Sequence, residues 1–175
     1  KFKFLFSDAS FIRVIRNTLA MGTINLVTSF LMAIIFAILL NEVKNVLGKK
    51  MVQTISYLQH FLSWIIVTGI LHDALSSTGI VNEVLQKLGI VSSQINFFAH
   101  ESYFWPIVAF SNLWKETGWN AIIYLAAITA IDPSLYEAAS IDGAARWAKI
   151  RYITLPGIKP TIMILLLMNV GNVLN

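Results

Sequence analysis

The chain has 175 residues, of which 57% are hydrophobic and 13% are charged. Soluble domains average about 25% charged residues, so this composition excludes an ordinary water-soluble globule. The formal net charge is +4, but the basic residues flank apolar stretches, which argues against a nucleic-acid partner. Cysteine is absent from the sequence, and this excludes disulfides, thiolate catalysis and cysteine-ligated zinc. The class indicated is an all-α integral membrane protein.

Two long stretches of the sequence carry no charge. None falls between Arg16 and Glu42, a gap of 25 residues, or between Lys50 and Asp73, a gap of 22 residues. As helices these stretches would reach roughly 37 and 33 Å, enough to cross a hydrocarbon core of about 30 Å. We expect both ends of the chain to be cut, because the first residue is not methionine and the last apolar run, 161–175, covers only about 23 Å.

The first predicted span covers 18–40. Residues 11–19 place basic side chains on one helical face and apolar ones on the other, which predicts a helix in the membrane interface before the chain turns into the bilayer. Small and polar residues then recur every four positions, and such a stripe lets another helix approach closely. They are Asn25, Ser29, Ala33 and Ala37. For Asn25 a packing role and a role as pathway ligand both stay open.

The second predicted span covers 51–71 and has a polar face at spacings of three or four residues. Its members are Gln53, Ser56, His60 and Ser63. Lipid cannot satisfy these groups, so the face must line a pathway or bond to neighbouring helices. The following residues, 72–101, are more polar and predict a surface segment with a short amphipathic helix, a Glu83–Lys87 pair and a stop at Gly89.

The third predicted span, 103–131, is interrupted by Lys115 and Glu116. Neither uncharged half is long enough to cross a bilayer alone, so a single helix of about 30 residues with a weak point near Gly118 is expected. Ionisable groups at membrane depth are costly unless they are paired or hydrated, which favours a functional role for Lys115 and Glu116. A place at the outer interface is the alternative for this pair.

Basic residues in the loops orient the spans. Segment 41–50 has three, segment 132–160 has four, and segment 72–101 has only Lys87. The positive-inside rule therefore puts the first two segments in the cytoplasm. Residues 1–16 conflict with this assignment, because three crossings place them outside although they carry four basic side chains. These are Lys1, Lys3, Arg13 and Arg16.

Segment 132–156 contains the elements of a bent pair of short helices. Ser134 with Glu137 forms a capping box behind Pro133, and Gly143 can take the left-handed conformation that ends the first helix. A second helix over 144–152 would then leave at an angle. Two further prolines, Pro156 and Pro160, are expected to break the chain before the last span, 161–175.

The same segment resembles a family signature. Glu137-Ala138-Ala139, Gly143 and Ile153-x-Leu155-Pro156 match, at every fixed position, the EAA motif of permease subunits from binding-protein-dependent ABC importers. Asn17-Thr18-Leu19, Tyr57-Leu58 and Ile131-Asp132-Pro133-x-Leu135-Tyr136 resemble the maltose-type carbohydrate branch. The stretches 41–43 and 53–58 are similar to permeases for oligosaccharides from polysaccharide breakdown. Gln59 stands where those relatives commonly have a proline that kinks the helix.

The resemblance implies that residues 1–175 are one incomplete transmembrane permease domain of MetI-like fold, in the bacterial cytoplasmic (inner) membrane. Its partners would be a second permease subunit in a heterodimer, two ABC ATPase subunits and an extracellular solute-binding protein. Segment 132–156 would be the cytoplasmic coupling segment, which moves with the ATPases and tips the spans between inward-facing and outward-facing states. The implied contacts to the ATPase are Glu137, Ala138, Ala139, Asp142 and Gly143.

The chain lacks the phosphate-binding motif G-x-x-x-x-G-K-[ST], since Gly48-Lys49 has Val43 and Lys50 at the other required positions. We therefore expect no enzyme activity, no cofactor and no metal on this chain, with ATP-Mg bound by the partner ATPases.

Sugar translocation needs aromatic faces and groups that hydrogen-bond hydroxyls. The pathway candidates are Tyr57, His60, Trp64, Trp114, Lys115, Glu116, Trp119, Asn120 and Tyr124. Interface belts and helix packing are the alternative roles for the Trp and Tyr residues.

Two other functions compete with transport driven by ATP. An intramembrane hydrolase is suggested by Ser56 four residues before His60 and by His72 beside Asp73, but neither G-x-S-x-G nor H-E-x-x-H occurs. An ion-driven secondary transporter would need carboxylates deep in its spans, and only Glu116 is available.

Overall fold

The computed structural model describes residues 9–171, and that part of the chain is all helical. The elements in order are α2 (Ala9–Glu42), α3 (Val46–Leu58), η1 (Gln59–Phe61), α4 (Trp64–Leu75), α5 (Ile80–Lys87), α6 (Glu101–Thr129), α7 (Pro133–Ile141), α8 (Arg146–Lys149), η2 (Ile150–Thr154) and α9 (Leu155–Gly171). Helix η1 is a 3₁₀ turn and η2 a π-helical turn.

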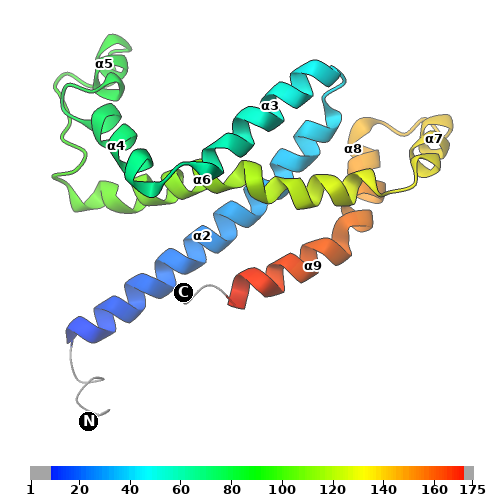
Figure 1. Ribbon diagram of the computed structural model, residues 1–175, viewed down its shortest axis with the longest axis horizontal. Helices are drawn as coiled ribbons and strands as arrows, with labels where there is room; N and C mark the ends of the chain where they lie inside the picture. The colour runs from blue at the N-terminus through cyan, green and yellow to red at the C-terminus, as the bar shows by residue number, and fades with distance from the viewer. Residues whose placement is uncertain (1–8, 172–175) are drawn as a thin grey trace.

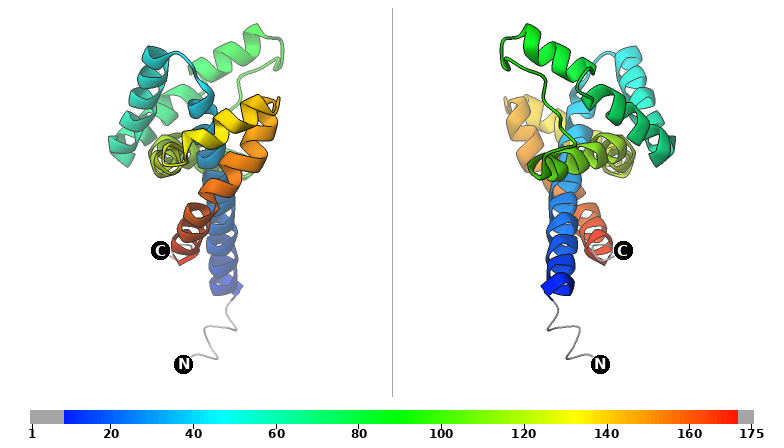
Figure 2. Two further views of the ribbon diagram at one scale, coloured as in Figure 1. Left: turned by 90° about the vertical axis from the view of Figure 1, so that its right-hand side faces the viewer. Right: turned by 90° about the vertical axis from the view of Figure 1, so that its left-hand side faces the viewer.

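Helix α6 crosses α2 and organises the other elements around it (Figures 1 and 2). The α4 and α5 helices lie near the N-terminal end of α6, and α7 and α8 lie near its C-terminal end. The segments predicted to face opposite sides of a membrane are thus at opposite ends of α6. Within residues 9–171, three helical segments are long and apolar enough to cross a membrane: Ser10–Glu42, Trp64–Lys87 and Arg146–Gly171. Helix α6 joined to α7 through a 68° bend would be a fourth.

The core lies where α2, α6 and α9 meet. Ala33 and Ala37 of α2 are fully buried there with Ala121 of α6 and Ile158 of α9. The ring of Phe30 on α2 also meets Tyr124 edge to face, with centroids 6.2 Å apart. The prediction that a small-residue stripe admits a second helix is confirmed, since alanines leave room for close packing.

The structure corrects the prediction of a separate interfacial helix ahead of the first span. One unbroken helix runs from Ala9 to Glu42, so the amphipathic residues 11–19 are part of α2 itself. Residues 11–19 contain neither proline nor glycine, so nothing in the backbone stops the helix there. The basic residues Lys1 and Lys3 lie outside the described residues.

The single span predicted over 51–71 is also wrong, because the chain breaks in its middle. Helix α3 tightens into η1, Leu62 is extended with φ −69° and ψ 133°, and α4 starts at Trp64. The Ser63 hydroxyl caps α4 by accepting from the Ile65 N–H at 3.2 Å. Apolar composition indicates that residues can enter lipid, but it does not report whether their helix is continuous.

The single helix predicted over 103–131 and the short amphipathic helix predicted within 72–101 are both present. The surface placement of 72–101 stays a prediction, since Trp64–Lys87 is long and apolar enough to cross a membrane. Helix α6 is a single helix of 29 residues that contains Lys115 and Glu116, and it is not broken at Gly118. Helix α5 carries the Glu83–Lys87 ion pair, whose charged atoms are 2.6 Å apart, and Gly89 follows with φ +69°.

The two ends of segment 132–156 differ from the prediction. Asp132, not Ser134, caps α7, because its carboxylate accepts from the Ser134 N–H at 2.9 Å. Pro156 and Pro160 do not break the chain, which stays helical from α8 through η2 into α9. The widened π-helical turn comes directly before Pro156, and such local adjustments satisfy backbone groups that a proline frees.

Candidate functional site

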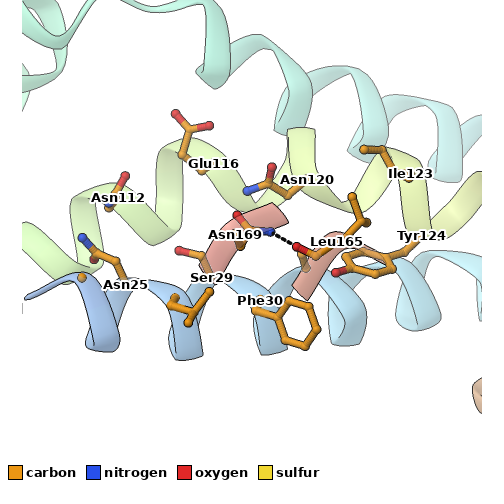
Figure 3. A pocket seen from close by; sticks show the side chains of 13 residues that line it. Asn25, Ser29, Phe30, Asn112, Glu116, Asn120, Ile123, Tyr124, Leu165 and Asn169 are labelled. Carbon is orange, nitrogen blue, oxygen red and sulfur yellow. Dashed lines mark hydrogen bonds between the residues drawn. The ribbon is translucent and has the colours of Figure 1, made fainter. Parts of the chain in front are cut away.

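A polar pocket of about 310 Å³ lies between α2, α6 and α9 (Figure 3). Four carboxamide side chains and one hydroxyl contribute most of its polar groups: Asn25, Ser29, Asn112, Asn120 and Asn169. The Oδ1 atom of Asn25 is buried and has no hydrogen-bond partner among the described residues. Carboxamides donate and accept hydrogen bonds, so this pocket presents both donors and acceptors to a ligand.

Two stripes with the same period form the pocket. On α6 the lining residues Asn112, Glu116, Asn120 and Tyr124 follow at intervals of four, and Asn25 and Ser29 do the same on α2. Sequence reasoning selected Glu116, Asn120 and Tyr124 but missed Asn112. The regular spacing along α6 was the signal that could have identified it. Asn169 was also missed, and its only signal was an amide side chain within a mostly apolar run.

The other pathway candidates lie on a different side of α6, where it meets η1 and α4. The imidazole of His60 stacks on the Trp119 ring with centroids 4.5 Å apart. Its Nδ1 atom lies 2.9 Å from Glu116 Oε2. The Lys115 ammonium donates to the His60 carbonyl at 2.7 Å and lies 3.3 Å from Glu116 Oε1. The same ammonium group lies 5.4 Å from the ring centroid of Trp64.

Trp114 lies along the same side. In the amide orientation that satisfies both groups, Gln59 donates to the Trp114 carbonyl at 2.7 Å and accepts from the Trp114 indole N–H at 3.1 Å. Tyr57 is half-buried on α3. Apart from Tyr57, the candidates therefore divide into a group that lines the pocket and a group that joins α6 to the broken span, and Glu116 belongs to both.

The hydrolase hypothesis finds no support in the contacts of the histidines. His60 bonds to Glu116, and no hydrogen bond joins it to Ser56 in the described residues. His72 is exposed, lies 3.5 Å from Asp73 and stacks on Phe98. Within residues 9–171 no group of three or more His, Asp or Glu side chains is arranged to hold a metal ion.

The bend in segment 132–156 is well defined. Gly143 has φ +76°, a conformation that favours glycine, and the next N–H, that of Ala144, bonds back to the Ala139 carbonyl at 2.8 Å. The hydroxyls of Tyr136 and Thr154 lie 2.9 Å apart. At the start of α7, the hydrogen bond from the Ser134 N–H holds the pKa of Asp132 below its ordinary value.

Most of the predicted coupling residues are exposed at the end of the molecule that α7 forms. Glu137, Ala138, Asp142 and Gly143 are exposed, and Ala139 is half-buried. Apolar side chains beside them are also uncovered: Ile141 is 87% exposed and Trp147 is 79% exposed. Sequence reasoning did not select these two residues, although apolar side chains within a polar segment were a visible signal.

A buried amide organises the segment at the opposite end of α6. Asn82 is 1% exposed, and its Nδ2 donates to the carbonyls of Ser76 and Ile95 at 2.9 and 2.8 Å. Its Oδ1 accepts from the Ile95 N–H at 2.8 Å. This residue was also missed, because nothing in the amphipathic pattern distinguishes a buried asparagine from an exposed one.

Comparison with known proteins identifies relatives along nearly the whole chain. The permease protein YteP of the polygalacturonan/rhamnogalacturonan transport system of Bacillus subtilis is 44% identical over 97% of this chain, and protein LplB of the same organism is 39% identical over 99%. These alignments cover 53% and 54% of the two relatives, so the chain spans about half their length.

A solved structure has the same fold. A bacterial ABC transporter involved in the import of the acidic polysaccharide alginate contains a chain that is 46% identical and superimposes with a TM-score of 0.93, covering 99% of this chain and 60% of that one. The sequence model for the binding-protein-dependent transport system inner membrane component matches residues 11–175. The chain therefore belongs to this family of membrane permeases.

Proposed function

We propose that this chain is part of a permease subunit of an ATP-driven importer and forms part of the pathway for a sugar or oligosaccharide. Its family and its relatives, whose names refer to polygalacturonan, rhamnogalacturonan and alginate, support this proposal. The place of action would be the bacterial cytoplasmic membrane, which three apolar helical segments could cross.

The amide-lined pocket is the observation that carries the sugar assignment. Polar groups between membrane helices are expensive unless they bond to each other or to a ligand. The unpartnered oxygen of Asn25 and the amides of Asn112 and Asn120 are available to hydroxyl groups. Tyr124 adds an aromatic ring to the same wall. Such a surface suits a carbohydrate better than an apolar solute.

The EAA segment would transmit the energy of ATP to these helices. We propose that residues 132–156 dock on an ABC ATPase, with Glu137 as a polar contact and the uncovered Ile141 and Trp147 as apolar contacts. Two such ATPases would bind ATP-Mg, and a second permease subunit would complete a heterodimer. ATP binding would then favour one of two helix arrangements by a few kcal/mol.

A solute-binding protein outside the membrane would deliver the sugar. A structural relative at 46% identity has been solved with an alginate pentasaccharide-bound periplasmic protein. In this chain the segment 76–95, held by Asn82, lies at the opposite end of α6 from α7 and is the described region suited to such a partner.

An ion-driven transporter is a weaker alternative. Its deep carboxylate would have to be Glu116, which is already bonded to His60 and Lys115. A carboxylate that must bind and release an ion in each cycle is less suited to a fixed pairing with a lysine.

The test is reconstitution of the full-length permease with its sister permease, ATPases and binding protein in proteoliposomes. Neutral and acidic oligosaccharides, amino acids and peptides are then scanned for stimulation of ATP hydrolysis. We expect stimulation by an oligosaccharide. Stimulation by amino acids or peptides alone would refute the sugar assignment, and uptake driven by an ion gradient without ATP would refute the ATP-driven importer.

A further inference from the structure

Two unusual features of this chain meet at one point. The second span breaks after η1 without any proline, and α6 carries a lysine that is only 5% exposed. The Lys115 ammonium donates to the carbonyl of His60, a residue of η1, at 2.7 Å. A broken helix and a buried lysine are each unfavourable by themselves between membrane helices. We therefore asked whether each one stabilises the other.

A helix break leaves backbone carbonyls without their usual partners. Next to this break, the Gln59 carbonyl accepts from the Leu62 N–H at 3.2 Å and the Ser63 carbonyl from the Val67 N–H at 3.0 Å. The His60 carbonyl accepts from Lys115. Because water is scarce at membrane depth, such a carbonyl must find a partner within the protein.

The lysine is in turn neutralised where it lies. Glu116 Oε1 is 3.3 Å from the ammonium, and Glu116 Oε2 is 2.9 Å from the His60 ring. The His60 ring also stacks on the Trp119 ring, which covers one face of the imidazole. Thus backbone and side chain of one η1 residue are both held by consecutive residues of α6.

We propose that His60, Lys115 and Glu116 form a latch that maintains the break in the second span and sets the direction of α4. In this assignment Lys115 is a positioning residue for transport. The inference rests on the proposed function for its role in transport, whereas the geometry of the latch can be tested independently.

The latch is also linked to the pocket through Glu116. This residue lines the pocket, yet its carboxylate points away from α2, toward the side where η1 lies (Figure 3). A sugar in the pocket that hydrogen-bonded Glu116 would compete with His60 and Lys115 for the carboxylate. Such competition would couple binding in the pocket to the geometry of the break.

The experiment measures, in the full transporter, a distance between α3 and α4 that changes with the angle between them. Spin labels are attached to cysteines introduced at Ile55 of α3 and Ile70 of α4, which are exposed in the described chain. This chain has no cysteine of its own; cysteines elsewhere in the transporter are replaced first. Distance distributions between the labels are compared for wild type and the variants Lys115→Met, Lys115→Arg and Glu116→Gln, with Lys44→Met as a control in an exposed loop.

We expect Lys115→Met to broaden or shift the distance distribution and to reduce sugar-stimulated ATP hydrolysis by about tenfold, as when a buried acceptor loses its donor. Lys115→Arg should restore both because it keeps a cationic donor. Glu116→Gln should disturb the distance less than Lys115→Met, since the bond to the His60 carbonyl survives. Lys44→Met should match wild type.

An unchanged distance distribution in Lys115→Met would overturn the latch, as would an equal change in Lys44→Met. A larger change in Glu116→Gln than in Lys115→Met would overturn the assignment of the carbonyl bond as its main element. Failure of every sugar to stimulate wild-type ATP hydrolysis would instead refute the proposed function, and the distance measurement would still decide on the latch.

Discussion

The hydroxyl of Tyr136 on α7 lies 2.9 Å from the hydroxyl of Thr154 in η2, and this bond joins α7 to the π-helical turn that leads into α9. Thr154 is buried. A second link runs from the Lys149 ammonium to the Ser140 hydroxyl at 2.6 Å. Force applied to α7 by a docked partner would therefore reach α9 through hydrogen bonds as well as through the backbone.

Tyr136→Phe should lower the free energy of unfolding by about 1 kcal/mol, because one hydrogen bond to a buried hydroxyl is lost. Sugar-stimulated ATP hydrolysis should fall while basal hydrolysis is retained. Thermal unfolding and ATPase assays of the reconstituted transporter measure the two effects. Tyr152→Phe is the matched control, because Tyr152 is exposed; an equal effect of both variants would contradict the role of the Tyr136 bond.

Gly143→Ala should cost about 1 kcal/mol of stability and weaken coupling between sugar and ATP hydrolysis. The space around Gly143 is open, so the cost comes from its φ of +76° and not from a clash. Gly69→Ala is the control, since it also has open space but lies within helix α4. Gly143→Asn should be milder than Gly143→Ala, because asparagine tolerates positive φ better. The reverse order in thermal unfolding would rule out the backbone explanation.

Gly118→Ala should destabilise the protein by about 1–3 kcal/mol, because the added methyl group would overlap the backbone of Ser56 on α3. Gly157→Ala is a suitable comparison. There the methyl group would meet the end of the Ile131 side chain, which can rotate away. The melting temperature should therefore fall more for Gly118→Ala, and a larger fall for Gly157→Ala would show that α3 and α6 are not in tight contact.

Asn25→Leu and Asn82→Leu should have opposite effects on stability. Leucine at position 25 removes a buried oxygen without a partner, so stability should be unchanged or increased, while sugar transport should decrease by about tenfold. Leucine at position 82 removes three hydrogen bonds and should cost about 3 kcal/mol. Thermal unfolding combined with sugar uptake separates the two cases. A destabilised Asn25→Leu with normal uptake would argue for a packing role of Asn25.

Much of the fold followed from local features of the sequence. The uncharged stretch after Arg16 predicted one long helix, the alanines at 33 and 37 predicted close helix contact, and Gly143 predicted the bend. These features depend on residues within a few turns of each other, where side-chain spacing and backbone preference decide the outcome. The small and polar period of four on α2 predicted close helix packing and left a pathway role for Asn25 open, and Asn25 and Ser29 of this stripe line the pocket.

Other features depended on residues far apart in the sequence. Near the break after η1, the His60 carbonyl bonds to Lys115, a residue 55 positions away. No sequence pattern within the second span predicts that contact. Spacing showed that polar residues of α6 share a face, but only packing decided that Asn112 and Asn120 face a pocket while Trp119 faces η1. The sequence by itself determined that the chain is helical and apolar enough for a membrane, but not where the helix of the second span breaks. Tertiary structure decided which neighbour satisfies each buried polar group, because that depends on how helices distant in the sequence pack together.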